Sequence, residues 1–141
     1  MNWTPLQTRT HFSLQQGYCK PEELVAKCSE LGYLACAITD INTLAGAICF
    51  YKACKKHSIK PIIGCTFKIG TYSQTYVSKN KAGWYELIDI ITTINSLDGE
   101  QALEHLKRVV AQDNLIPISD IEQTPIYYTE KTDADLHRIL L

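Results

Sequence analysis

The sequence predicts an α/β fold, with parallel strands in one open sheet or in part of a barrel. Apolar segments of strand length alternate with amphipathic segments of helical spacing over roughly the first 70 residues. This alternation is typical of parallel strands that right-handed helical crossovers connect. The 141 residues, 45% of them hydrophobic and 21% charged, fit a single domain over residues 1–141.

The first elements are predicted as strand, helix and strand. Residues 4–8 favour an extended strand, because Thr and alternating polarity are typical of strands. Pro21 suits the first position of a helix, and Gly32 is expected to end it. Residues 34–39 form a short apolar run, which predicts a strand buried on both faces.

A second helix and a third strand are expected to follow. Asn42 or Thr43 could cap this helix, and residues 60–69 read as a strand with residues 72–78 able to pair beside it. We expect the strands near residues 4–8, 34–39 and 61–69 to lie parallel in one sheet. The apolar face of the helix is expected to consist of Leu44, Ala47, Ile48, Tyr51 and Cys54.

Two consecutive helices then break the alternation. Asn80 can cap the first of them, and Asp98 with Gln101 forms a plausible capping box for the second. Short strands are expected at residues 115–118 and 125–128, and a final helix at residues 132–141.

Charge and cysteine usage limit the classes of function. A formal net charge of -1 argues against a strong nucleic-acid footprint, so contact with DNA is expected to be indirect. Lys52, Lys55, Lys56 and Lys60 could touch phosphates, but a solvated helix face is the favoured interpretation.

The six cysteines include no C-x-x-C pair and are expected to be buried, reduced thiols. With no apolar run of membrane-spanning length and no signal peptide, a cytoplasmic protein is expected.

Three sequence blocks carry a specific resemblance. They are LQTRTHFSLQQG at residues 6–17, LGYLACAITDINTLAGAICFY at residues 31–51 and IKPIIGC at residues 59–65. Without any gap, they are similar to the ordered motifs of the PHP (polymerase and histidinol phosphatase) domain of the bacterial-type DNA polymerase III alpha subunit. The corresponding family motifs are an H-x-H strand with an S-L-x-D-G turn, a strand ending in T-D-H, and I-K-P-I-x-G-x-E.

The resemblance implies a PHP-type partial or distorted (β/α) barrel, or a truncated form of one. The clear match covers residues 3–70, and looser similarity covers residues 77–94 and 133–141. It further implies that the chain is an N-terminal piece of a larger polymerase that acts in DNA replication, a DNA-directed DNA polymerase and hence a nucleotidyltransferase.

Active members of the family hold a metal cluster at the carboxyl ends of the strands, bound by His, Asp and Glu. At the matching positions this chain keeps Asp40, whereas most other ligands are replaced by residues that bind metals weakly or not at all. We therefore expect no metal cofactor, with His11 and Asp40 as weak candidate ligands, and a hypothetical ion pair between Arg9 and Asp40. The vestigial site implied by the resemblance consists of Pro5, Gln7, Arg9, Gln16, Asp40, Ile41 and Thr66.

The leading hypothesis is a non-catalytic PHP module that acts as a scaffold or docking surface within a replicative polymerase. Its implied partners are the remainder of the polymerase chain and a proofreading exonuclease subunit. One alternative is a phosphoesterase or 3'-5' proofreading nuclease that depends on Zn, Mn or Mg. A second alternative is a stand-alone regulatory module derived from such a polymerase.

Overall fold

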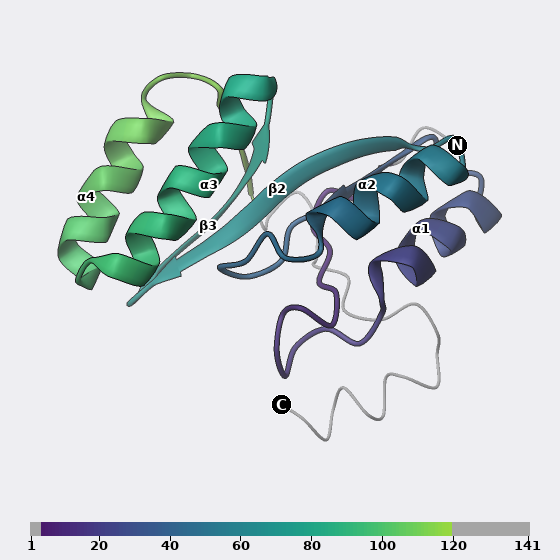
Figure 1. Cartoon of the computed structure of the whole chain (residues 1–141), viewed down its shortest axis with the longest axis horizontal. Helices are drawn as coiled ribbons and strands as arrows, with labels where there is room; N and C mark the ends of the chain where they lie inside the picture. The colour runs from purple at the N-terminus through teal and green to yellow at the C-terminus, as the bar shows by residue number, and fades with distance from the viewer. Residues whose placement is uncertain (1–3, 120–141) are drawn as a thin grey trace.

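The computed structural model describes residues 4–119, so the elements expected at residues 125–128 and 132–141 lie outside the described part. The chain forms a mixed α/β structure, which confirms the predicted fold class (Figure 1). Its elements are α1 (Pro21–Glu30), β1 (Ala35–Ile38), α2 (Ala47–Lys56), β2 (Lys60–Ile69), β3 (Tyr72–Ser78), α3 (Lys81–Ser96), α4 (Gly99–Val110) and β4 (Leu115–Ile118).

One four-stranded sheet, in the order β1-β2-β3-β4, organises the described residues. The strands β1 and β2 are parallel, as predicted, whereas β3 is antiparallel to both β2 and β4. The ten-residue strand β2 joins the two arrangements, because residues 60–63 pair with β1 and residues 64–69 pair with β3. This strand therefore connects the parallel part of the sheet to its antiparallel part.

Residues 4–8 were expected to form a strand, and this expectation is wrong. The segment runs beside β1 in the same direction, with the Pro5 carbonyl accepting from the Ala37 N–H at 2.9 Å. A ladder does not form, because the Thr8 N–H donates to the side chain of Thr39 at 2.9 Å and the Thr8 hydroxyl donates to the Ala37 carbonyl. Side-chain bonds thus take the positions that backbone pairing would need.

The second helix begins later than predicted. Asn42 does not cap it, because its side-chain amide exchanges two hydrogen bonds of 2.9 Å with the backbone of Lys68 in β2. Gly46 occupies the cap position instead. The buried face of α2 includes Phe50 and Ala53 with Ala47 and Cys54, while Ile48 and Tyr51, predicted to be buried, are 58% and 43% exposed.

The helices α3 and α4 begin where predicted. The Asn80 side chain accepts from the Gly83 N–H, and the Asp98 side chain accepts from the Gln101 N–H. Both helices pack on the β2–β3 part of the sheet, whereas α1 and α2 lie together over the β1 part (Figure 1). Within residues 4–119, none of the helices is long and apolar enough to cross a membrane.

Two clusters of buried apolar residues make up the core. The first lies among α1, β1 and α2 and contains Phe50, and the second lies among β2, β3, α3 and α4 and contains Phe67. Ile63 of β2 packs against both clusters. All six cysteines are free thiols; Cys19, Cys28, Cys36, Cys54 and Cys65 are buried as expected, whereas Cys49 is exposed.

Candidate functional site

The candidate site lies at the carboxyl end of β1, where Thr39 and Asp40 leave the strand. Asp40 is 2% exposed and Thr39 is fully buried. Two further segments meet them there, namely residues 5–13 from the start of the chain and Thr66 from the middle of β2. Since carboxyl ends of parallel strands gather side chains at one edge, these polar residues come together although they are distant in sequence.

Hydrogen bonds from the turn after residue 9 occupy the Asp40 carboxylate. Its Oδ1 accepts from the Thr10 N–H and from the Ser13 hydroxyl, both at 2.6 Å. Its Oδ2 accepts from the Thr10 hydroxyl at 2.7 Å. Three short donors therefore compensate the cost of burying this charge.

Arg9 contacts Thr39 rather than Asp40. Its guanidinium Nη1 donates to the Thr39 carbonyl at 2.5 Å and to the Thr39 hydroxyl at 3.1 Å. The carboxylate oxygens of Asp40 accept from Thr10 and Ser13 instead, so the hypothetical ion pair between Arg9 and Asp40 is wrong. The positive charge of Arg9, which is 4% exposed, is nonetheless buried next to Thr39, the residue before Asp40.

A chain of hydroxyl groups extends from Thr39 into the sheet. The Thr66 hydroxyl donates to the Thr39 carbonyl at 3.1 Å and lies 2.7 Å from the Thr75 hydroxyl. Thr75 is the direct cross-strand neighbour of Thr66 in β3, and its hydroxyl is 3.3 Å from Gln7 Oε1. Gln7, Thr66 and Thr75 are all buried, so the network is shielded from bulk solvent.

The other predicted site residues lie around this centre. In the described contacts, their side chains make no hydrogen bond to the polar network. Pro5 is buried and contributes its carbonyl to Ala37, and Gln16 is half-buried in the turn, where its N–H donates to the Ser13 carbonyl. Ile41 is half-exposed, and its N–H donates to the Ser13 hydroxyl at 3.0 Å. The exposed His11 ring lies 4.3 Å from the Phe12 ring, centroid to centroid.

Within the part of the chain that the structure describes, the residues at this centre do not fit a divalent metal. Using Asp40 as a ligand would break short hydrogen bonds, and the Arg9 guanidinium would repel a cation. The Cys65 thiol donates to the Asp40 carbonyl at 3.2 Å, and burial raises its pKa to about 12, so it is a protonated donor in this arrangement. Among residues 4–119, no group of three His, Cys, Asp or Glu side chains is arranged to hold a metal ion.

Sequence reasoning did not single out several residues that build this centre. Thr39 and Ser13 stood inside the quoted motifs, and their buried hydroxyls follow a strand end and a turn, where such side chains often bind the backbone. Thr10 could have been suspected in the same way. Nothing in the sequence pattern indicated Thr75, since its role depends on the register between β2 and β3.

Residues 5–136 match the family model described as the PHP domain. The chain therefore belongs to the PHP domain family, which confirms the resemblance seen in its three sequence blocks. Within that family it is similar to the DNA polymerase III subunit alpha of several bacteria.

Two of these relatives illustrate the extent of the similarity. The chain is 36% identical over 103 residues to the Bacillus subtilis subunit, an alignment that covers 68% of this chain and 9% of that protein. It is 40% identical over 74 residues to the Chlamydia muridarum subunit, covering 52% of this chain and 6% of that protein. The chain thus spans less than a tenth of the length of these relatives.

Among solved structures, the chain is similar to a protein from Bifidobacterium adolescentis that carries the name metal-dependent phosphoesterase. The TM-score is 0.48 at 20% sequence identity, covering 63% of this chain and 33% of that chain.

Proposed function

We propose that this chain is the PHP module of a DNA polymerase III alpha-like protein that acts in DNA replication, and that the module itself is non-catalytic. In this proposal it supports the rest of the polymerase chain as a scaffold and docking surface. The parent would be a cytoplasmic DNA-directed DNA polymerase, and a proofreading exonuclease subunit is a candidate partner. Similarity to the amino-terminal family domain of such polymerases supports the replication context.

One observation carries the non-catalytic part of the proposal. The Asp40 carboxylate, the strong oxygen ligand that the chain keeps at the matching positions, accepts three hydrogen bonds of 2.6 to 2.7 Å from Thr10 and Ser13. A catalytic zinc usually has about three protein ligands and an open position for water. Here hydroxyl groups and a guanidinium fill the space in which such ligands would converge.

The proposed relic therefore works as a clamp. Thr10 and Ser13 tie the first segment of the chain to Asp40 after β1, and Thr66 ties β2 to Thr39. Replacing metal coordination by hydrogen bonds of this kind preserves the meeting of three segments without an ion.

The test uses the purified chain. We expect elemental analysis to find far less than one zinc, manganese, magnesium or iron ion per chain, and no hydrolysis of a phosphodiester such as bis-p-nitrophenyl phosphate above a buffer control. Incubation with each metal should leave both results unchanged, because the site lacks converging ligands.

About one bound metal ion per chain, together with hydrolysis that a chelator abolishes, would overturn the non-catalytic proposal and favour a metal-dependent phosphoesterase or nuclease. A matched variant identifies the source of any such signal. Asp40→Asn should abolish it if the ion is bound at this site, whereas Asp113→Asn, on the exposed loop before β4, should leave it unchanged.

A further inference from the structure

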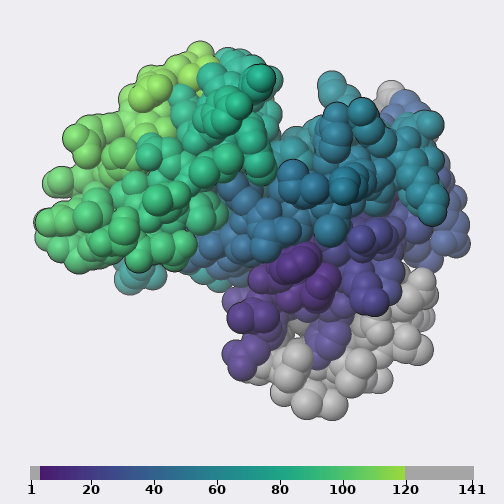
Figure 2. All heavy atoms as spheres, in the orientation of Figure 1, coloured from purple at the N-terminus to yellow at the C-terminus, as the bar shows by residue number. Residues whose placement is uncertain are grey.

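An apolar groove lies between α2 and α3, away from the Asp40 centre. Figure 2 shows the surface hollowed between these two helices. Its narrow part has a volume of about 230 Å³. We call this feature the α2–α3 groove; its narrow part is lined by Ala47, Ile48, Tyr51, Ile63, Ser78 and Trp84.

The groove continues over the sheet. An adjoining hollow of about 540 Å³ shares Tyr51, Ile63 and Ser78 with it and extends over β2, β3 and β4, where Lys60 and Lys79 line it. A cavity of about 150 Å³ holds one benzene-sized group, so the narrow part has room for one or two large apolar side chains. The 58% and 43% exposure of Ile48 and Tyr51 leaves part of this lining open to solvent.

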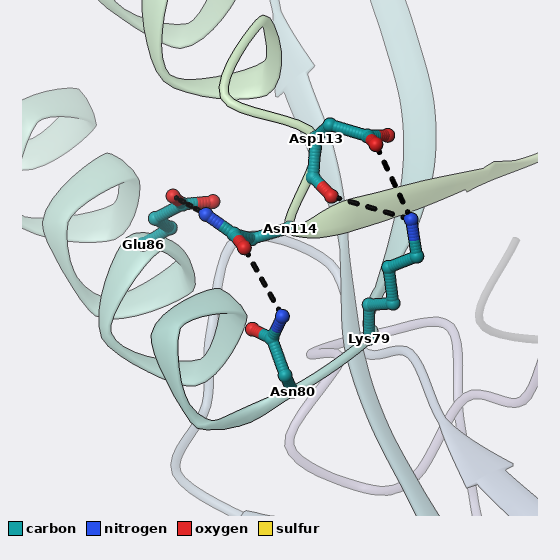
Figure 3. A network of polar contacts seen from close by, with 5 residues as sticks. All are labelled: Lys79, Asn80, Glu86, Asp113 and Asn114. Carbon is teal, nitrogen blue, oxygen red and sulfur yellow. Dashed lines mark hydrogen bonds and ion pairs between the residues drawn. The ribbon is translucent and has the colours of Figure 1, made fainter.

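The sequence segment that supplies the narrow part of the groove is basic. Residues 41–85 contain seven lysines, half of the chain's 14 basic residues, and no aspartate or glutamate. Of these lysines, Lys79 forms an ion pair with Asp113 at 3.3 Å (Figure 3), and the ion pairs described within residues 4–119 involve none of the other six. Lys55 lies over the Tyr51 ring, 5.3 Å from its centroid, so a cation stands directly beside the apolar lining.

From this combination we infer that the α2–α3 groove is a docking site for an acidic amphipathic helix of a partner protein. Apolar side chains on one face of that helix would fill the groove, and carboxylates beside them would meet Lys52, Lys55 and Lys60. The inference rests on the proposed docking role and specifies its partner. It uses none of the residues around Asp40.

Two other occupants fit less well. A second copy of this chain would bring the same lysine-rich face against itself, because a two-fold interface places identical patches together. Nucleic acid would satisfy the lysines, but the chain's formal net charge of -1 gives little overall attraction for a phosphate backbone, and the lining of the groove is mainly apolar. An acidic amphipathic helix satisfies both the apolar lining and the charge.

The experiment measures binding by fluorescence anisotropy with the purified chain. The probe is a fluorescein-labelled helical peptide of about 16 residues, with Leu and Phe at positions i, i+3, i+4 and i+7 and Glu at most others. We expect saturable binding that weakens as salt rises, and no binding of the same peptide with Lys in place of Glu. Ile48→Glu should weaken binding at least about tenfold, since it places a carboxylate in the groove.

Matched variants decide whether the groove is responsible. Lys55→Glu combined with Lys60→Glu should also weaken binding and reduce its salt dependence, and it keeps the apolar lining intact. Leu97→Glu, at the opposite end of α3 from Trp84, and Lys107→Glu, on α4, should bind like the unmodified chain. Circular dichroism of every variant checks that the chain is folded.

Either of two peptide results would overturn the inference: no saturable binding of the acidic peptide, or equal weakening of its binding by the groove and control variants. A third result would also overturn it. Single-stranded oligothymidylate of about 20 nucleotides would compete with the peptide and bind more tightly, and the same lysine variants would lose this oligonucleotide binding. The last result would identify a nucleic-acid surface. Stoichiometric metal in the unmodified chain would contradict the non-catalytic proposal without changing any of these readouts, so the two failures are distinguishable.

Discussion

At the scale of single residues, Asp40 shows how a buried carboxylate can serve structure instead of chemistry. Hydrogen bonds to a charged acceptor contribute about 1.5 to 3 kcal/mol each, and Asp40 receives three of them from the segment that begins the chain. Carboxylates kept for catalysis usually lie where their charge is poorly compensated and therefore cost stability. The two roles predict opposite effects of removing the charge.

We expect Asp40→Asn to lower the free energy of unfolding by about 2 to 4 kcal/mol, because an amide group would face the donors of Thr10 and Ser13. Urea denaturation measures this change. Asp113→Asn is the matched control and should change stability by less than about 0.5 kcal/mol, since the Asp113 side chain is 87% exposed and its ion pair with Lys79 is solvated. A neutral or stabilising effect of Asp40→Asn would contradict the clamp.

The sequence could predict only part of this centre. The gap-free motif match grouped Gln7, Arg9, Asp40 and Thr66, and the structure brings these four residues around Thr39. It could not predict that Arg9 would bond to Thr39 instead of Asp40, because rotamer and partner choice depend on the surrounding packing. That these residues are the relic of a metal site stays a proposal.

At the scale of elements, the sequence predicts where a helix starts when a side chain close by in the sequence accepts a hydrogen bond from the free N–H groups at that start. The caps Asn80 and Asp98 bond to N–H groups three residues ahead, so the starts of α3 and α4 could be read from sequence. The start of α2 could not, because Asn42 bonds to Lys68 in β2 and only the fold brings them together. The strand predicted at residues 4–8 is absent for the same reason, because Thr8 bonds to Thr39 and Ala37, which only the fold brings close.

The turn that carries Ser13 depends on a glycine. A Cβ atom at Gly17 would lie 2.1 Å from the Thr10 carbonyl oxygen, a contact that the backbone must move to relieve. We expect Gly17→Ala to reduce the free energy of unfolding by about 2 kcal/mol or more, since it displaces Thr10 from Asp40. Thermal and urea denaturation measure the loss.

Gly99→Ala is the control for this turn. Its Cβ would meet only Ile69 at an ordinary 3.6 Å, and alanine favours the helix that Gly99 begins. This variant should be neutral or slightly stabilising. Equal stability of the Gly17→Ala and Gly99→Ala variants would show that the turn relaxes freely and does not hold Ser13 in place.

At the scale of the whole molecule, β2 makes the two core clusters depend on each other. Its first four residues pair with β1 beside the first cluster, its last six pair with β3 in the second, and Ile63 packs against both. Removing either cluster would expose apolar surface of the other through this shared strand. We therefore expect the described part of the chain to unfold as one cooperative unit.

Two probes, one in the first cluster and one on α3, the helix that supplies Leu87 and Ile90 to the second cluster, test this expectation during urea denaturation. In a Trp3→Phe background the fluorescence reports on Trp84 of α3, and pulsed thiol labelling with mass spectrometry reports on Cys36 and Cys54 in the first cluster. The folded state protects Cys54, because burial raises the pKa of its thiol to about 12 and keeps it protonated. Coincident midpoints are expected. Labelling of Cys36 and Cys54 at a urea concentration that leaves the Trp84 signal native would instead show that the two clusters unfold independently.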